Sequence, residues 1–494
     1  MLFQKHTVSI ALLLISILPG CGREQAEEAA PDETPPEISR TTTARPGCRS
    51  CHPYSLAETH AELSCISCHN GDNRTADLGD AHIDLISHPA SPANMDTKCG
   101  GCHQETAAVA ASRHYTLSNA VNLVRRHFGA DRDLASLLEI PVTDRPTTPL
   151  ELADDLLRRR CLRCHVYYEG DKYSQVEHGT GCAACHLEYE DGKPVTHEFL
   201  ALPTDSRCLS CHYANRVGSD YYGHFDHDFK LEYRTPYQPG GYYPARPYAV
   251  EQHRLVPDIH QAAGMTCSDC HFDMHGGTTM ETLGCAACHL RQNLPAAAKH
   301  LSIEDGELNV TTRQARRKIV VPRATDPVHG RYEDTVACTV CHSQWSYNDQ
   351  ETSLVRIDHE EYEEWDELYV QDSSEVEVLL LNGIYGDQIL EPVMTDKISG
   401  LEKPGLWLKG FKIRRWAAPL IDFDREGRLQ VMRPLLDLHI SWVNVREETV
   451  FDSVGGESKT LRPFTPHTIG KAGAFYHQRI SKLFPREPSQ AGQK

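Results

Sequence analysis

Cys48-Arg-Ser-Cys51-His52 is the first of nine copies of one pattern, in which two residues separate two cysteines and a histidine follows the second. The nine copies use every cysteine of the chain except Cys21. The cysteines are Cys48 and Cys51, Cys65 and Cys68, Cys99 and Cys102, Cys161 and Cys164, Cys182 and Cys185, Cys208 and Cys211, Cys267 and Cys270, Cys285 and Cys288, and Cys338 and Cys341. The histidines are His52, His69, His103, His165, His186, His212, His271, His289 and His342.

This pattern is typical of c-type haem attachment. Two thiols at this spacing reach the two vinyl groups of one porphyrin, and the adjacent imidazole is held under the iron as its proximal ligand. Zinc ribbons also use C-x-x-C pairs, but they need no histidine after each second cysteine. A disulfide framework would explain the cysteines and leave the nine histidines unexplained. The sequence therefore predicts nine haem c cofactors, each with its iron.

The remaining histidines are numerous enough to give every iron a second ligand, because the chain has 28 histidines in all. A haem with histidine on both faces is closed to small ligands and moves electrons, whereas a haem with one histidine can do chemistry. A histidine shortly before a motif can reach a neighbouring haem. This criterion favours His60, His88, His178, His260 and His329 as distal ligands. Weaker candidates are His82, His114, His197, His224, His227, His253, His275, His300, His359 and His467.

The N-terminal segment predicts export. A charged start followed by the apolar stretch Val8 to Leu18 has the order of a secretory signal peptide over residues 1–20. Leu18-Pro19-Gly20-Cys21 resembles the lipobox of bacterial lipoproteins, in which the cysteine is lipidated; ordinary signal cleavage is the alternative, because proline is atypical there. Residues 21–46 have the composition of a disordered tether. After residue 20 no apolar run approaches the ~20 residues of a membrane-spanning helix.

The haem motifs divide the rest of the chain into three expected regions. These are an N-terminal haem region over residues 47–130 with three motifs, a main haem region over 131–345 with six, and a haem-free C-terminal domain over 346–494. The motifs are too dense for each haem to have its own polypeptide shell, so porphyrins are expected to pack against one another. Motifs one and two, four and five, and seven and eight follow each other closely, and each such pair is expected to bring two haems near contact.

The expected fold is a haem-packed multihaem cytochrome c, mainly α-helix and loop with little regular structure. Thr147-Thr148-Pro149 predicts a helix start, and that helix would run into Cys161. Residues 105–128 also look helical. Residues 375–381, 406–415 and 438–446 show apolar runs or alternation, which predict a small β-containing C-terminal domain.

The charge of the chain restricts its partners. A net charge of −19 gives no support to nucleic-acid binding through phosphate neutralisation. A basic redox protein or a cation is the electrostatic partner that this charge would favour.

Taken together, the motifs resemble the multihaem c-type cytochromes of bacterial respiratory and extracellular electron-transfer chains. His260-x-x-Ala-Gly-Met-Thr-Cys267-Ser-Asp-Cys270-His271, followed by Met274-His275-Gly276, is similar to a phrase of lipoprotein cytochromes of metal-reducing bacteria, as is Cys211-His212-x-x-Asn215-Arg216-Val217-Gly218. In those relatives a Pro-His-Thr phrase, here Pro466-His467-Thr468, often precedes another motif. None follows here, so a tenth haem of the family pattern is missing.

The resemblance implies an electron-transfer relay at the outer membrane, facing the periplasm or the cell surface. Its implied partners are periplasmic or outer-membrane cytochromes and a porin conduit, with an oligomer or filament as a further option. The alternative is a multihaem reductase or oxidase resembling the octahaem hydroxylamine, nitrite and tetrathionate enzymes. Several of those mark their catalytic haem by lysine in place of the proximal histidine, and all nine motifs here end in histidine. An active haem can also keep its proximal histidine and lack a distal one, so the enzyme stays open and no catalytic residue is assigned.

Overall fold

The computed structural model describes the chain from residue 47 to residue 483, apart from several gaps. These gaps are residues 53, 55, 57, 214–216, 227–245, 278–280, 348–349, 362, 366–372, 386–389, 414, 435–436, 456–460 and 474–475. All described residues belong to one unit, Pro46–Lys494. The expected signal peptide, Cys21 and the tether lie outside them. No helix in the described part is long and apolar enough to cross a membrane.

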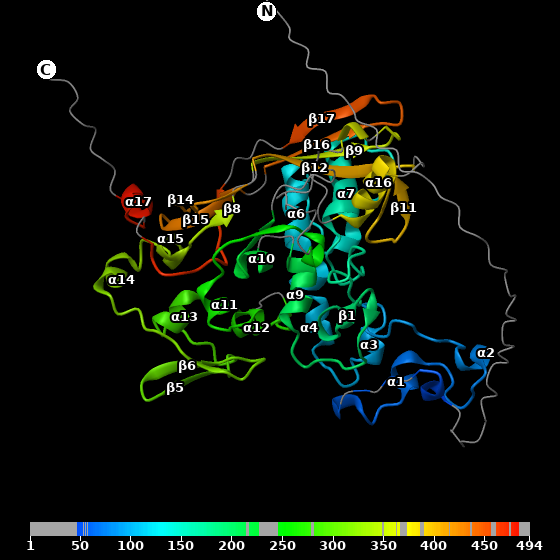
Figure 1. Ribbon diagram of the computed structural model, residues 1–494, viewed down its shortest axis with the longest axis horizontal. Coiled ribbons are helices and arrows are strands. Elements are labelled where there is room, and N and C mark those ends of the chain that lie inside the picture. The colour runs from blue at the N-terminus through cyan, green and yellow to red at the C-terminus, as the bar shows by residue number, and fades with distance from the viewer. Residues whose placement is uncertain are drawn as a thin grey trace, which may run out of the picture. The chain divides into compact units, whose positions relative to one another are not determined.

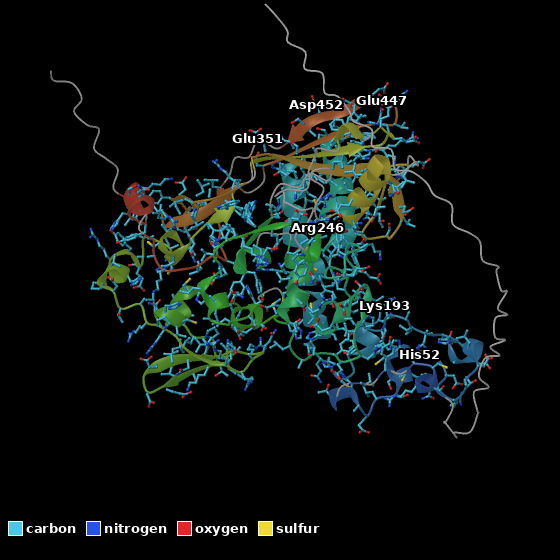
Figure 2. All side chains as sticks on the ribbon, viewed as in Figure 1. His52, Lys193, Arg246, Glu351, Glu447 and Asp452 are labelled. Carbon is cyan, nitrogen blue, oxygen red and sulfur yellow. The ribbon has the colours of Figure 1, made fainter. Side chains whose placement is uncertain are left out.

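Most of the motifs form a single short helical turn. In a helix, residues i, i+3 and i+4 share one face, so a turn at the motif points both thiols and the imidazole to the same side. Motif residues occupy η1 (Cys48–Ser50), α1 (Cys65–His69), α8 (Ala183–His186), α9 (Asp205–His212), α12 (Cys267–Cys270), α13 (Cys285–His289) and α15 (Cys338–His342). α3 (Met95–Lys98) ends directly before the third motif. Figure 2 draws the side chains on the ribbon and labels His52 of the first motif.

The helix expected before the fourth motif is confirmed. α7 (Pro149–Leu156) starts at Thr148, whose side chain accepts from the backbone N–H of Glu151 at 3.2 Å, while the Glu151 carboxylate accepts from the backbone N–H of Thr148. The helix continues through η4 (Leu157–Cys161), a π-helical turn, into the motif. The helical stretch expected over residues 105–128 is divided into α4 (Thr106–Ala110), α5 (Arg113–Thr116) and α6 (Ser118–His127).

The largest sheet has four strands in the order β12-β9-β16-β17. β9 and β16 are parallel and the other neighbours are antiparallel. Helix α7 lies beside this sheet (Figure 1). Leu152 and Leu156 of α7 are buried in one core with Ile357, Trp407 and Ile440 of the sheet. The strands are β9 (Gln350–Ile357), β12 (Leu406–Ile413), β16 (Leu438–Val443) and β17 (Thr449–Gly455).

One expected strand is wrong. Residues 375–381 lie in a helix, α16 (Ser374–Tyr385). Val376, Leu379 and Leu380 are the buried positions, and their spacing of three and four residues is helical. The alternating Glu-Val-Glu-Val start of this segment suggested a strand, but the leucines that follow set the buried face.

Smaller sheets occur on both sides of the expected boundary at residue 346. Val336, Ala337 and Val340 beside the ninth motif share a core with Ile421 and Leu429, so the C-terminal region packs directly against a haem motif. Three-stranded sheets are β5 (Leu301–Glu304), β6 (Glu307–Thr311) and β7 (Lys318–Val320), and β14 (Leu420–Phe423), β15 (Leu429–Pro434) and β18 (Leu461–Pro463). Two-stranded sheets are β1 (Tyr189–Glu190) with β2 (Lys193–Pro194), β3 (His224–Asp226) with β4 (Gln252–Arg254), β8 (Ser346–Tyr347) with β13 (Trp416–Ala417), and β10 (Val393–Thr395) with β11 (Glu402–Pro404).

The remaining helices are short. They are α2 (Leu78–Ala81), α10 (Gly218–Tyr221), α11 (Ile259–Ala262), α14 (Pro327–Tyr332) and α17 (Tyr476–Ile480). Single 3-10 turns are η2 (Glu58–His60), η3 (Leu137–Glu139), η5 (Pro247–Ala249), η7 (Glu363–Trp365) and η8 (Ser481–Leu483).

Candidate metal centres

One continuous cavity of about 3610 Å³ joins the nine motifs. Both cysteines and the histidine of every motif border it. Nine further histidines also border it, which is one for each motif. These are His60, His82, His114, His178, His197, His260, His275, His329 and His467.

Eight of the nine motif histidines lie beside one of these further histidines, and the ring centroids are between 5.7 and 6.3 Å apart. The pairs, motif histidine first, are His52 and His82 (6.1 Å), His69 and His197 (6.2 Å), His103 and His60 (6.3 Å), His186 and His275 (5.7 Å), His212 and His114 (6.2 Å), His271 and His467 (6.1 Å), His289 and His260 (6.0 Å), and His342 and His329 (6.2 Å).

This spacing fits one metal ion between the two rings. An imidazole nitrogen binds a metal ion at about 2 Å, and the ring centroid lies about 1 Å behind the nitrogen, so two imidazoles on opposite sides of one ion have centroids about 6 Å apart. Ordinary aromatic pairs occupy a wider range, about 4.5–7 Å. Eight pairs in the narrow interval, each with one motif histidine, therefore indicate a common geometric role.

In six of the paired histidines the outer ring nitrogen is held so that Nε2 is available to a metal. A neutral imidazole that donates from Nδ1 keeps the lone pair of Nε2 for the metal, and such an outer hydrogen bond is usual for metal-binding histidines. Nδ1 donates to the carbonyl of Ile86 from His69 (2.9 Å), of Leu200 from His186 (2.6 Å), of Pro322 from His289 (2.8 Å), of Gly470 from His342 (2.9 Å) and of Leu78 from His82 (2.7 Å). In His260 it donates to the carboxylate of Asp258 (2.8 Å).

Burial favours the neutral form of six of these rings, and neutral imidazole is the form that binds a metal. Loss of hydration lowers the pKa of both rings in the pair His271 and His467 and of one ring in each of four other pairs. The others are His114, His186, His197 and His289, and burial is the largest cause in each.

The eight pairs leave His165 of the fourth motif and His178. His165 is 3% exposed, its Nε2 has no hydrogen-bond partner, and burial lowers its pKa to about 4. Its ring lies against Tyr167 and Tyr168, with centroids 6.0 and 6.1 Å away. His178 is 2% exposed, and its Nδ1 donates to the carbonyl of Gly179 at 2.7 Å. His178 is thus the one further histidine of the cavity that belongs to none of the eight pairs, and the fourth motif is the one motif without a paired histidine.

Four of the five expected distal histidines border the cavity, and one does not. His60, His260 and His329 each lie beside a motif histidine, and His178 borders the cavity. His88 does not border it; this residue lines a separate hollow of about 420 Å³ and is not supported as a ligand. Position shortly before a motif therefore selected four cavity histidines out of five, but it did not select the other five histidines of the cavity.

Five cavity histidines were only weaker candidates from the sequence. His275 and His467 each belong to one of the three phrases that carried the family resemblance, and this was the available sequence signal for them. His82, His114 and His197 had no such signal. Of the other weaker candidates, His253 packs on Trp416 with centroids 4.7 Å apart, His300 donates from Nε2 to the carbonyl of Asp269 at 2.8 Å, His224 lies near Tyr222, and His359 is buried. His227 lies outside the described residues.

Zinc fits the site less well than haem does. Among the described residues, one group of three or more candidate ligands has its ligand atoms close together, and it combines Asp205 and Cys208 with Cys267 of another motif. A structural zinc ion takes four ligands, usually from one compact set. The described cysteines are also free of disulfides. The donor set of eight motifs, two thiols and a histidine with a second histidine beside it, is suited to a covalently attached haem.

A comparison of the chain with the known protein families, with curated proteins and with solved structures finds no match in any of the three.

Proposed function

We propose that the protein is an electron-transfer relay with nine c-type haems, each held between two histidines. The observation that carries the proposal is the set of eight histidine pairs with centroids 5.7–6.3 Å apart around one cavity. A bound haem supplies an iron that gains and loses one electron. We assign His178 as the ninth distal ligand, opposite His165.

The chain's own residues would do three things in this relay. The two thiols of each motif attach the cofactor, which fixes its position and its neighbours. Two imidazoles close both faces of the iron, so that small molecules cannot bind there. Backbone carbonyls such as those of Leu200 and Gly470 fix the ring orientation and raise the basicity of the ligand.

The proposal includes a place in the cell. The signal-like start and the lipobox-like Cys21 would export the chain and anchor it to the outer membrane, towards the periplasm or the cell surface. The net charge of −19 would favour a basic redox protein, such as another cytochrome, as electron donor or acceptor. A Cys21→Ala variant is then expected in the soluble fraction, and its retention by membranes would count against the anchor.

The first test of the function is the haem count. Protein expressed with a c-type haem attachment system is expected to carry nine haems per chain, measured by the pyridine haemochrome spectrum and by intact mass. The matched control is Cys267→Ala with Cys270→Ala, which is expected to carry eight. Zinc in place of haem, or thiols that stay unmodified, would overturn the proposal.

A further inference from the structure

Asp258 is a buried carboxylate that contacts the second ligand proposed for the haem of the eighth motif. It caps helix α11, and His260 lies in the first turn of this helix. Oδ1 of Asp258 accepts from the backbone N–H of His260 at 2.9 Å and from the ring Nδ1 of His260 at 2.8 Å. The His260 ring lies beside His289 of the eighth motif, with centroids 6.0 Å apart. One carboxylate oxygen therefore holds both the backbone and the ring of this histidine.

The other carboxylate oxygen holds a segment that lies 211 residues further along the chain. Oδ2 of Asp258 accepts from the backbone N–H of Ile469 at 2.7 Å. The carbonyl of Ile469 in turn accepts from the backbone N–H of Ile259 at 2.8 Å. These two hydrogen bonds fix the C-terminal segment against the start of α11.

This C-terminal segment serves two further motifs. It carries His467, whose ring lies beside His271 of the seventh motif with centroids 6.1 Å apart. It also carries Gly470, whose carbonyl accepts from Nδ1 of His342 of the ninth motif at 2.9 Å. One carboxylate therefore contacts a histidine of the eighth haem directly and holds the segment that serves the seventh and ninth haems.

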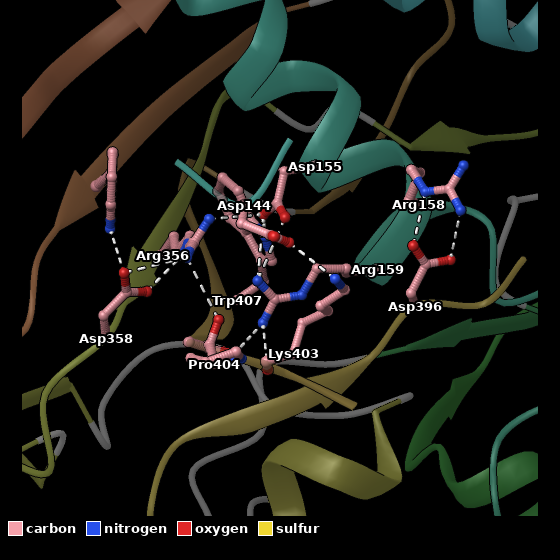
Figure 3. A network of polar contacts seen from close by, with 12 residues as sticks. Asp144, Asp155, Arg158, Arg159, Arg356, Asp358, Asp396, Lys403, Pro404 and Trp407 are labelled. Atoms are coloured by element: carbon pink, nitrogen blue, oxygen red, sulfur yellow. Dashed lines mark hydrogen bonds and ion pairs between the residues drawn. The ribbon is translucent and has the colours of Figure 1, made fainter. Parts of the chain in front are cut away.

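Asp258 differs from several other buried carboxylates in having no cation as its partner. Asp396, for example, accepts two hydrogen bonds from Arg158, at 2.7 and 3.0 Å (Figure 3). Within the described part of the chain, no lysine or arginine forms an ion pair with Asp258; its donors are two backbone N–H groups and the ring of His260. A buried carboxylate normally has a positive partner. The ring of His260 connects this carboxylate to the iron that would supply the positive charge.

Other paired histidines have weaker acceptors on Nδ1. In five of them Nδ1 donates to a backbone carbonyl, which is neutral. In His103 of the third motif the carboxylate of Glu105 lies 3.4 Å from Nδ1, but the two side chains are 52% and 45% exposed. Water weakens the interaction of exposed charges. The contact of His260 with Asp258 is shorter, and its carboxylate is buried.

We infer that Asp258 is a positioning residue of the eighth haem, which orients His260 and makes it a stronger electron donor to the iron. This inference rests on the proposed function. A carboxylate attracts the Nδ1 proton more strongly than a neutral carbonyl does, and this raises the basicity of the imidazole. A more basic ligand stabilises the oxidised iron, which carries one positive charge more than the reduced iron. Asp258 therefore lowers the reduction potential of the eighth haem.

The test is an optical redox titration of haem-loaded Asp258→Asn. Asparagine keeps an oxygen that can cap α11 and accept from His260, but it removes the charge. One ninth of the absorbance change is expected to move to higher potential, while electron spin resonance still shows nine low-spin haems. A titration identical to that of the wild type, or a shift to lower potential, would overturn the inference. Nine low-spin haems would support the relay even then, so the two failures are distinguishable.

The matched control is Glu105→Gln, which makes the same chemical change beside His103 at an exposed pair. Its shift is expected to be smaller, and an equal or larger shift would contradict the role assigned to the buried carboxylate. Asp258→Glu restores the charge and is expected to return the component towards its wild-type potential. A component that stays at the potential of Asp258→Asn would contradict the electrostatic role.

A variant with Asp258 unchanged covers the case in which Asp258→Asn fails to fold. Cys285→Ala with Cys288→Ala removes the eighth haem and is expected to remove one ninth of the absorbance change from the low-potential half of the titration. Arg323 follows Pro322, the carbonyl partner of His289, but Arg323 is exposed and water screens its charge. A loss from the high-potential half would overturn the inference.

Discussion

The fourth and seventh motifs, called sites 4 and 7, border the same cavity and share one residue pattern, but they differ in the segments and the charged groups that surround them. At site 4 a helix with three consecutive arginines leads into the motif, and the C-terminal region covers it. At site 7 buried carboxylates surround the thiols, and His467 lies beside His271 with centroids 6.1 Å apart. The comparison teaches that the motif fixes where a haem would attach, whereas segments remote in sequence decide its second ligand and its electrostatic surroundings.

The largest expected effect is the loss of a second ligand. His467→Ala is expected to convert one low-spin haem to high-spin and to create a site for cyanide, because nothing then closes the second face at site 7. His178→Ala should do the same at site 4. Electron spin resonance with and without cyanide measures both changes, and His88→Ala, outside the cavity, is the control. An unchanged spectrum for His178→Ala would show that site 4 lacks this ligand. The two sites would then also differ in whether a second histidine binds the iron.

A large loss of stability is expected where the C-terminal region covers site 4. Asp396→Ala leaves Arg158 buried without its carboxylate partner, which costs about 3–5 kcal/mol in the free energy of unfolding. Asp133→Ala removes the partner of the exposed Arg126 and is expected to cost about 0–1 kcal/mol. Denaturant unfolding followed by tryptophan fluorescence compares the two. Equal losses would mean that the cover over site 4 is not a packed part of the structure.

The smallest expected effect is a shift of potential at site 7. Asp205→Asn removes one half-buried negative charge and keeps an oxygen that can accept from the N–H of Cys267, so one component of the redox titration should move to higher potential. Asp133→Asn on the exposed surface is the control. A shift to lower potential would contradict the electrostatic role of Asp205 at site 7.

The sequence predicted local features well and remote ones poorly. The motif residues and the start of α7 depend on neighbours along the chain, such as the Thr148 and Glu151 capping pair. Pairings such as His271 with His467 and His69 with His197 depend on tertiary contacts, which position relative to a motif does not encode. For the same reason the expected boundary at residue 346 did not reveal that the C-terminal region contributes His467, the carbonyl of Gly470 beside His342, and the cover of site 4.

The central claim is that each iron would lie between two histidines, and low-temperature electron spin resonance of the oxidised, haem-loaded protein tests it most directly. The spectrum should be recorded before and after addition of cyanide or nitric oxide, together with a haem count. We expect nine low-spin haems whose signals do not change on addition of either ligand. A high-spin haem that binds the added ligand in the wild-type protein would contradict the claim and would mark that site as a catalytic centre.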